Sequence, residues 1–260
     1  MDFAALLRQE RDRSRKKGAG AAAVTSQDAS EDCREEEVLF EPFTRLIAAK
    51  PEPNWESTRR VKCDLDSVFY FQDWINDQDH DAFMEQVYCK AAKWKELPFR
   101  RLQCYQGNGL PPWIQNLADT LVRCGIFPVE IRPDHALLNE YLPGQGILGH
   151  TDGCAYLPLV ACLSLGSPAL ISFRERLATH EIGTREPKLL CQLLLQPKSL
   201  IVFKADAYEY ALHEICPTFS ETLTENVANL DECCGKKGAI IERGTRISVT
   251  MRRSSEQEKK

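Results

Sequence analysis

The spacing of apolar positions changes once along the chain, near Pro133. Before this point, segments 77–94 and 111–125 place apolar side chains every three or four positions, which predicts two helices that each bury one face. The second helix begins at consecutive prolines, which suit a first helical turn, and ends at a glycine. After Pro133, short apolar runs alternate with glycine, proline and polar residues, a pattern typical of strands. We expect strands over residues 67–71, 135–141, 157–165, 169–174, 189–195, 199–204, 208–213, 239–242 and 245–252.

Many short strands that follow two helices favour a mainly β fold with flanking helices. We expect the strands to form a double-stranded β-helix, which is a jelly-roll core. The polar segment 218–238 is predicted to be an inserted loop. Composition divides the chain into a largely disordered N-terminal tail over residues 1–60, a folded domain over residues 61–253, and a C-terminal tail over residues 254–260.

The bulk composition argues against several classes of protein. A formal net charge of −5 does not suit a protein that coats nucleic acid through bulk electrostatics, although it is compatible with a local basic groove. The longest apolar stretch, residues 156–173, is interrupted by proline and glycine, so it predicts two buried strands rather than a membrane span. The eleven cysteines show no regular spacing and are expected to be reduced thiols.

The N-terminal segment has two interpretations. Its apolar residues precede the basic run 11–17, which is the reverse of a secretion signal. The basic run is typical of a solvated tail, and it also fits a nuclear-import or partner-docking segment. We therefore expect the protein in the nucleus and cytoplasm. We also expect it to be a monomer without a membrane partner.

Three residues are candidates to hold a metal ion, namely His150, Asp152 and His213. In an extended segment, positions i and i+2 point to the same side, so His150 and Asp152 can bind one ion. His213 lies near the end of a predicted strand, and a barrel can bring two such strands together. Two histidines and one carboxylate are the ligand set of non-haem Fe(II) oxygenases. A histidine two residues before an aspartate also occurs by chance, and the other three histidines are interpreted as structural or exposed.

The predicted strand near the C-terminus carries a polar face made of Arg246, Ser248, Thr250 and Arg252. An arginine at each end fits a dicarboxylate, because a guanidinium pairs bidentately with a carboxylate. An amphipathic strand with its polar face in water would show the same pattern.

A second polar pair, Asn139 and Tyr141, precedes the metal-binding triplet and is followed by Leu-Pro-Gly at 142–144. An amide and a phenol beside a metal could bind the two ends of a keto acid through hydrogen bonds. An ordinary transition from strand to turn is the alternative.

The order of these motifs decides between the alternatives. The patterns N-x-Y, P-G, H-x-D, a distant histidine and R-x5-R follow one another, and in this order the sequence resembles the AlkB family of Fe(II)/2-oxoglutarate dioxygenases over about residues 61–253. Similarity to the sixth animal homologues within that family lies in Trp94, Arg101-Leu-Gln103, Leu110-Pro-Pro-Trp113 and the run that starts at Arg243.

The resemblance implies a role for each polar residue of the candidate site. The implied iron ligands, which are also the catalytic residues, are His150, Asp152 and His213. The implied contacts to 2-oxoglutarate are Asn139, Tyr141, Arg246, Ser248, Thr250 and Arg252. Arg246, assisted by Tyr141, would pair with the far carboxylate, whereas Arg252 and Asn139 would lie near the carboxylate that chelates the metal. Ser248 stands where bacterial-type members usually carry asparagine.

The resemblance also implies a reaction that uses Fe(II), 2-oxoglutarate and O2. The products would be succinate and, from an N-methyl substrate, formaldehyde. The implied partner is a methylated base of RNA or DNA, flipped into the pocket. The segment 93–105 mixes basic and aromatic residues where family members carry a substrate lid, and its candidate contacts are Trp94, Arg100, Arg101 and Tyr105. Core-packing aromatic residues beside solvated charges are the alternative.

Two other functions stay open at this point. The acidic net charge permits an oxygenase that acts on a protein side chain or a small molecule. A module that binds modified RNA without efficient turnover would retain the same fold, although the intact ligand set and both arginines argue against it.

Overall fold

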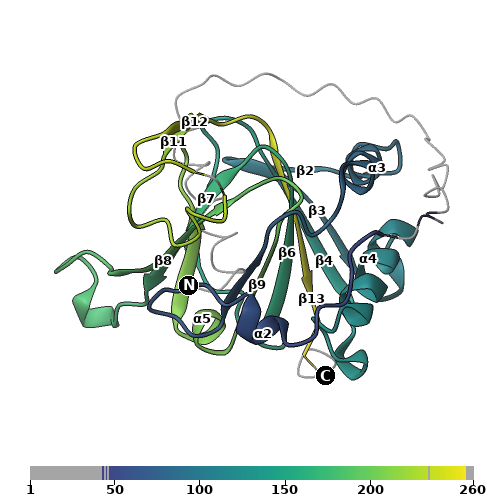
Figure 1. Ribbon diagram of the computed structural model, residues 1–260, viewed down its shortest axis with the longest axis horizontal. Coiled ribbons are helices and arrows are strands. Elements are labelled where there is room, and N and C mark those ends of the chain that lie inside the picture. The colour runs from purple at the N-terminus through teal and green to yellow at the C-terminus, as the bar shows by residue number, and fades with distance from the viewer. Residues whose placement is uncertain (1–42, 44, 46, 234, 256–260) are drawn as a thin grey trace, which may run out of the picture.

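The computed structural model describes residues 43, 45, 47–233 and 235–255. Within these residues, two antiparallel sheets form the body of the protein (Figure 1). The larger sheet has the strand order β1-β9-β6-β13-β4-β3-β2, the smaller sheet has the order β5-β10-β7-β8, and β11 pairs with β12 in a separate ribbon. The strands are Val68–Phe71 (β1), Lys95–Leu97 (β2), Arg100–Gln106 (β3), His135–Tyr141 (β4), Ile147–His150 (β5), Leu159–Gly166 (β6), Ala169–Glu175 (β7), Leu189–Leu195 (β8), Leu200–Lys204 (β9), Ala211–Ile215 (β10), Ser220–Thr222 (β11), Ile240–Glu242 (β12) and Arg246–Arg252 (β13).

The helices lie mainly on one side of the larger sheet. The α-helices are Trp55–Thr58 (α2), Asp77–Val87 (α3), Pro112–Arg123 (α4) and Ala205–Glu209 (α5). In Figure 1, α3 and α4 lie on the side of the larger sheet that faces away from β7 and β8. The apolar face of α4, including Trp113 and Leu117, packs in one core cluster with Leu138 of β4 and Val249 of β13. This arrangement confirms the predicted jelly-roll core with helical support.

Side chains of β13 alternate between two environments, because successive residues of a strand point to opposite faces. Ile247, Val249 and Met251 belong to the core beneath the helices. The four polar residues between and beside them, from Arg246 to Arg252, line a cavity between the two sheets. Every residue of β13 is buried, so its polar face points into the protein rather than into water.

Several elements differ from the sequence-based predictions. The first long helix ends at Val87 instead of residue 94, and residues 95–106 form the hairpin β2–β3 at the edge of the larger sheet. The segment predicted as strand 208–213 begins as helix α5, because Ala205 has a φ of 43° and Asp206 accepts hydrogen bonds from nearby backbone N–H groups. The predicted loop 218–238 contains β11, and β5 was not predicted.

The folded part extends beyond the predicted boundaries at both ends. Ile47, Ala49 and Trp55 are buried in the core beneath the helices, and Trp55 Nε1 donates a hydrogen bond of 3.0 Å to Gly125 O. Burial of apolar side chains therefore places residues 47–60, predicted as tail, within the domain. At the other end, the backbone N–H of Ser255 donates to Ala155 O. The rest of the predicted tails, residues 1–42 and 256–260, lies outside the described residues.

No helix in the described ranges combines the length and the apolar character that a membrane crossing requires.

Candidate active site

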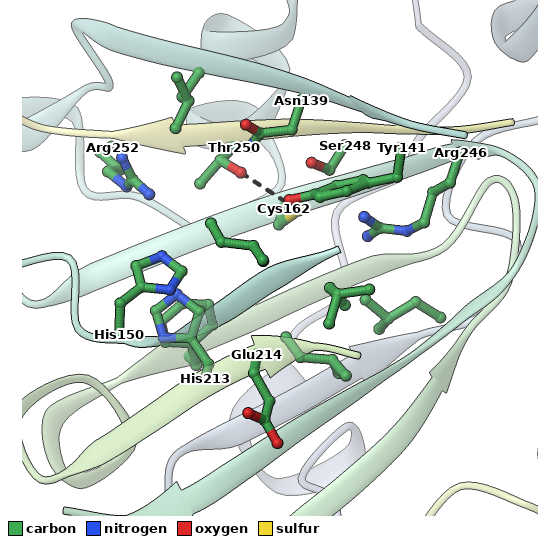
Figure 2. A pocket seen from close by; sticks show the side chains of 16 residues that line it. Asn139, Tyr141, His150, Cys162, His213, Glu214, Arg246, Ser248, Thr250 and Arg252 are labelled. Carbon is green, nitrogen blue, oxygen red and sulfur yellow. Dashed lines mark hydrogen bonds between the residues drawn. The ribbon is translucent and has the colours of Figure 1, made fainter. Parts of the chain in front are cut away.

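The structure brings His150, Asp152 and His213 together at one end of the cavity. Strands β5 and β10 are antiparallel neighbours whose register places His213 directly opposite His150. The two imidazole ring centroids lie 4.4 Å apart, and Asp152 follows two residues after His150. One ligand atom from each of the three residues lies within 4.8 Å of the others. Figure 2 shows both imidazoles at the same end of the pocket as Arg252.

Both histidines are neutral near pH 7. Burial lowers the pKa of His213 to about 3, and the positive charge of Arg252 acts in the same direction. Burial also holds the pKa of His150 well below its ordinary value. The Nδ1 atom of His150 lies 2.8 Å from Leu148 O, so Nδ1–H donates to this carbonyl and the lone pair stays on Nε2. The site thus offers imidazole lone pairs rather than imidazolium cations.

The carboxylate of Asp152 supports binding of a cation. Its Oδ1 accepts a hydrogen bond of 2.5 Å from Arg252, whereas its buried Oδ2 has no hydrogen-bond partner among the described residues. A buried carboxylate oxygen without a partner is costly, and a divalent ion would satisfy it. Two neutral imidazoles and one carboxylate fit Fe(II) and leave further coordination positions for ligands.

Arg246 provides a positive charge at the other end of the same cavity (Figure 2). Its side chain is buried and lies over the Tyr141 ring, with 5.6 Å between the guanidinium carbon and the ring centroid. Nη2 of Arg246 donates a hydrogen bond to Ser164 Oγ at 3.1 Å, whereas the buried Nε of Arg246 has no hydrogen-bond partner among the described residues. A ligand with a carboxylate would satisfy this donor, so both ends of the cavity offer a contact that the protein leaves open.

The register between β4 and β13 explains why the two polar motifs act together. Arg246 lies opposite Tyr141, and Ser248 lies opposite Asn139. With Thr250 and Arg252 of the same strand, these side chains form one polar wall of the cavity. The remaining lining residues are apolar except for Glu214: Leu137, Ile147, Cys162, Ile171, Leu195, Phe203 and Ile215. The structure therefore collects all nine residues predicted for the metal and the cosubstrate around one cavity or its metal end.

The predicted substrate contacts lie elsewhere. None of Trp94, Arg100, Arg101 and Tyr105 lines the cavity that contains the histidines. Arg100 is fully buried, and its Nε donates to Asn139 Oδ1 at 2.9 Å, so it supports the polar wall and does not fit the predicted phosphate contact. Arg101 pairs with the buried Glu140 at 2.6 Å and lies over the Trp94 ring at 4.4 Å. The segment forms an edge hairpin in which both arginines are already engaged by other side chains.

Two residues near the metal end were not singled out by the sequence. His135, interpreted as structural or exposed, is buried opposite Arg252 on β4. Tyr156, in the loop after Asp152, contacts both His135 and Arg252. Only the strand register brings these residues together, so no spacing in the sequence could have identified them.

Comparisons with known proteins identify the family of this chain. The 2OG-Fe(II) oxygenase superfamily matches residues 48–252. The zebrafish (Danio rerio) protein "Probable RNA/DNA demethylase ALKBH6" is 32% identical over 199 residues, which are 72% of this chain and 85% of the relative. The Macaca fascicularis "tRNA (carboxymethyluridine(34)-5-O)-methyltransferase ALKBH8" is 26% identical over 76% of this chain, which spans only 29% of that protein.

Among solved structures, that of OsALKBH1 aligns with a TM-score of 0.45 and 13% identity, and it covers 72% of this chain and 98% of its own. The superfamily match spans most of the chain, and the zebrafish relative is matched along most of its length. The chain therefore belongs to the 2OG-Fe(II) oxygenase superfamily and, within it, to the AlkB family, and it is an oxidoreductase that uses Fe(II), 2-oxoglutarate and O2.

Proposed function

We propose that this protein oxidatively demethylates a methylated base of RNA or DNA, with His150, Asp152 and His213 as the iron ligands. The observation that carries the proposal is a single cavity with the three candidate ligands at one end and the buried Arg246 at the other. A dicarboxylate that reaches from Arg246 to the metal would satisfy open contacts at both ends.

When bound, Fe(II) together with 2-oxoglutarate and O2 supplies the oxidation of the N-methyl group, and succinate, CO2 and formaldehyde are the products. The residues of the chain bind and orient the reactants. Arg246, Ser248 and Tyr141 would hold the far carboxylate of 2-oxoglutarate. Asn139, Thr250 and Arg252 would lie along the rest of the molecule toward the metal. The apolar lining excludes water from the cavity, which strengthens each of these contacts.

The substrate class is supported by one surface feature and by the name of the zebrafish relative. An open cleft of about 840 Å3 adjoins the loop around Asp152, because Thr151 and Gly153 line it. Two tyrosines, Tyr156 and Tyr208, also line this cleft, together with the cations of Arg176 and Arg253 and the carboxylates of Glu130 and Glu209. Its volume leaves room for a nucleobase with its sugar, and the tyrosines and arginines are groups that could contact a base and a phosphate.

The decisive experiment measures formaldehyde and succinate from methylated RNA and DNA oligonucleotides, with unmethylated oligonucleotides of the same sequence as controls. We expect formaldehyde from at least one methylated substrate, and its loss in His150→Ala at unchanged Tm. Succinate without formaldehyde from any oligonucleotide would redirect the search to a protein or small-molecule substrate. Binding of oligonucleotides without either product would indicate a binding module and overturn the proposal.

The iron assignment has its own test, which needs no substrate. Anaerobic protein with Fe(II) and 2-oxoglutarate should show a visible charge-transfer band, and His150→Ala should abolish it. A band that persists in this variant would contradict the ligand set. We also propose that the protein acts as a monomer in the nucleus and cytoplasm, which light scattering and cell imaging can test.

A further inference from the structure

A chain of contacts leads from the metal-binding carboxylate to a half-buried phenol ring and a buried imidazole. Arg252 donates to Asp152 Oδ1 at 2.5 Å, and its guanidinium carbon lies 4.9 Å from the centroid of the Tyr156 ring. The Tyr156 hydroxyl oxygen lies 3.1 Å from Nε2 of His135, whose ring centroid is 4.6 Å from that of Tyr156. Burial raises the pKa of Tyr156, and the positive charge of Arg252 opposes this rise. Tyr156 therefore contacts Arg252 through its ring and His135 through its hydroxyl.

The backbone holds these residues in place from two sides. His135 and Arg252 are directly paired on the adjacent strands β4 and β13. The loop that carries Tyr156 is tied to the end of β13, because Leu157 N donates to Arg253 O at 2.8 Å and Tyr156 forms an isolated bridge with Ser254. His135 and Arg252 are both 3% exposed or less. The aromatic pair is thus a fixed support under a guanidinium that faces the metal site.

The orientation of Arg252 determines how Asp152 can serve as a ligand. An arginine whose orientation is not constrained frequently pairs with both oxygens of a carboxylate through two parallel hydrogen bonds. In this structure, Arg252 donates to Oδ1 of Asp152, and Oδ2 has no hydrogen-bond partner among the described residues. A bidentate pair would occupy both oxygens and compete with the metal.

We propose that Tyr156, supported by His135, is a positioning residue that fixes the tilt of Arg252, so that Arg252 binds one oxygen of Asp152 and leaves the other for the metal. The proposal rests on the iron-ligand assignment of the proposed function, and it is independent of the substrate. Tyr156→Phe removes the contact of the hydroxyl with His135 and keeps the ring over Arg252, whereas Tyr156→Leu also removes the ring. Groups that orient metal ligands in this way typically contribute about 10- to 100-fold to metal affinity.

The test uses Mn(II) alone as a redox-inert probe, titrated into metal-free protein while the EPR signal of free Mn(II) is measured. We expect about tenfold weaker Mn(II) binding in Tyr156→Phe and a larger loss in Tyr156→Leu. 2-Oxoglutarate binding to the Mn(II)-loaded protein, measured by calorimetry, should weaken in the same order. The matched control is Tyr70→Phe, which removes a buried phenol hydroxyl of β1 and should leave Mn(II) affinity unchanged.

A double-mutant cycle separates positioning from general stability. If Tyr156 and His135 act on Arg252 as one unit, Tyr156→Phe combined with His135→Leu should weaken Mn(II) binding no more than the stronger single variant. Wild-type Mn(II) and 2-oxoglutarate affinities in folded Tyr156→Phe and Tyr156→Leu would overturn the proposal. Equal losses in these variants and in Tyr70→Phe would assign Tyr156 a merely structural role and would also overturn it. Absence of demethylation would contradict the proposed substrate class, but the Mn(II) and 2-oxoglutarate affinities predicted here would still be expected.

Discussion

Arg246 offers a prediction in which ligand binding and stability change in opposite directions. Its guanidinium is 2% exposed, and no carboxylate of the described residues pairs with it. Its contacts are the Ser164 hydroxyl at 3.1 Å and the face of Tyr141. A buried charge without a counterion destabilises the ligand-free protein, whereas a bound carboxylate would pair with it. Arg246→Met keeps a long apolar side chain and removes the charge.

The magnitude follows from the burial of Arg246. Removal of one partner of a buried, hydrogen-bonded charge pair costs about 3 kcal/mol, within a range of roughly 2–5 kcal/mol. At about 1.4 kcal/mol per factor of ten, this cost corresponds to about 100-fold weaker binding of 2-oxoglutarate. In the ligand-free protein, loss of the uncompensated charge should stabilise the fold by about 1 kcal/mol. For a domain of this size, that change raises the Tm by roughly 2–4 °C.

Arg243 is the matched control for this experiment. It is also buried, at 5% exposed against 2% for Arg246, but its guanidinium pairs with the buried carboxylate of Glu221 at 2.9 Å. Arg243→Met would leave Glu221 without its counterion, which should destabilise the fold by about 3–5 kcal/mol. 2-Oxoglutarate affinity should stay close to that of the unaltered protein, because Arg243 does not line the cavity.

Calorimetric titration of 2-oxoglutarate into the Mn(II)-loaded protein measures the affinity, and differential scanning fluorimetry of the ligand-free protein measures the Tm. The reasoning would be refuted by unchanged affinity in Arg246→Met. A lower Tm in the same variant would also contradict it, since this result would mean that Arg246 stabilises the ligand-free fold.

Three further variants test other parts of the structure. Ser248→Asn introduces into the cavity the longer polar side chain that bacterial-type members carry. One added hydrogen bond should tighten 2-oxoglutarate binding by about 2- to 10-fold, measured by calorimetry. Arg100→Leu removes the hydrogen bond to Asn139 and should weaken 2-oxoglutarate binding without changing the salt dependence of oligonucleotide binding. A weaker salt dependence in this variant would instead support a contact between Arg100 and a phosphate. Trp55→Ala should lower the free energy of unfolding, measured in denaturant, by about 3–5 kcal/mol. An unchanged denaturation midpoint would indicate that residues 47–60 do not belong to the folded domain.

Local pattern accounts for the parts of the fold that were predicted well. Strands β4 and β8 have the predicted bounds, because their apolar runs are sharply delimited. Local pattern also places His150 and Asp152 on one side of an extended segment, and it places four polar residues on one face of β13. These features depend only on the alternation of side chains along one strand.

Other features depend on contacts between distant segments, and the sequence alone left them open. The register of β10 against β5 sets His213 opposite His150, and the register of β4 against β13 sets His135 opposite Arg252. The same kind of pairing buries Arg100, which the local mix of basic and aromatic residues suggested as a phosphate contact. Alternation within a strand is a local property of the chain, whereas register and burial are set by which strands become neighbours. For this reason the sequence identified the chemical groups of the site, and only the tertiary structure decided which of them meet.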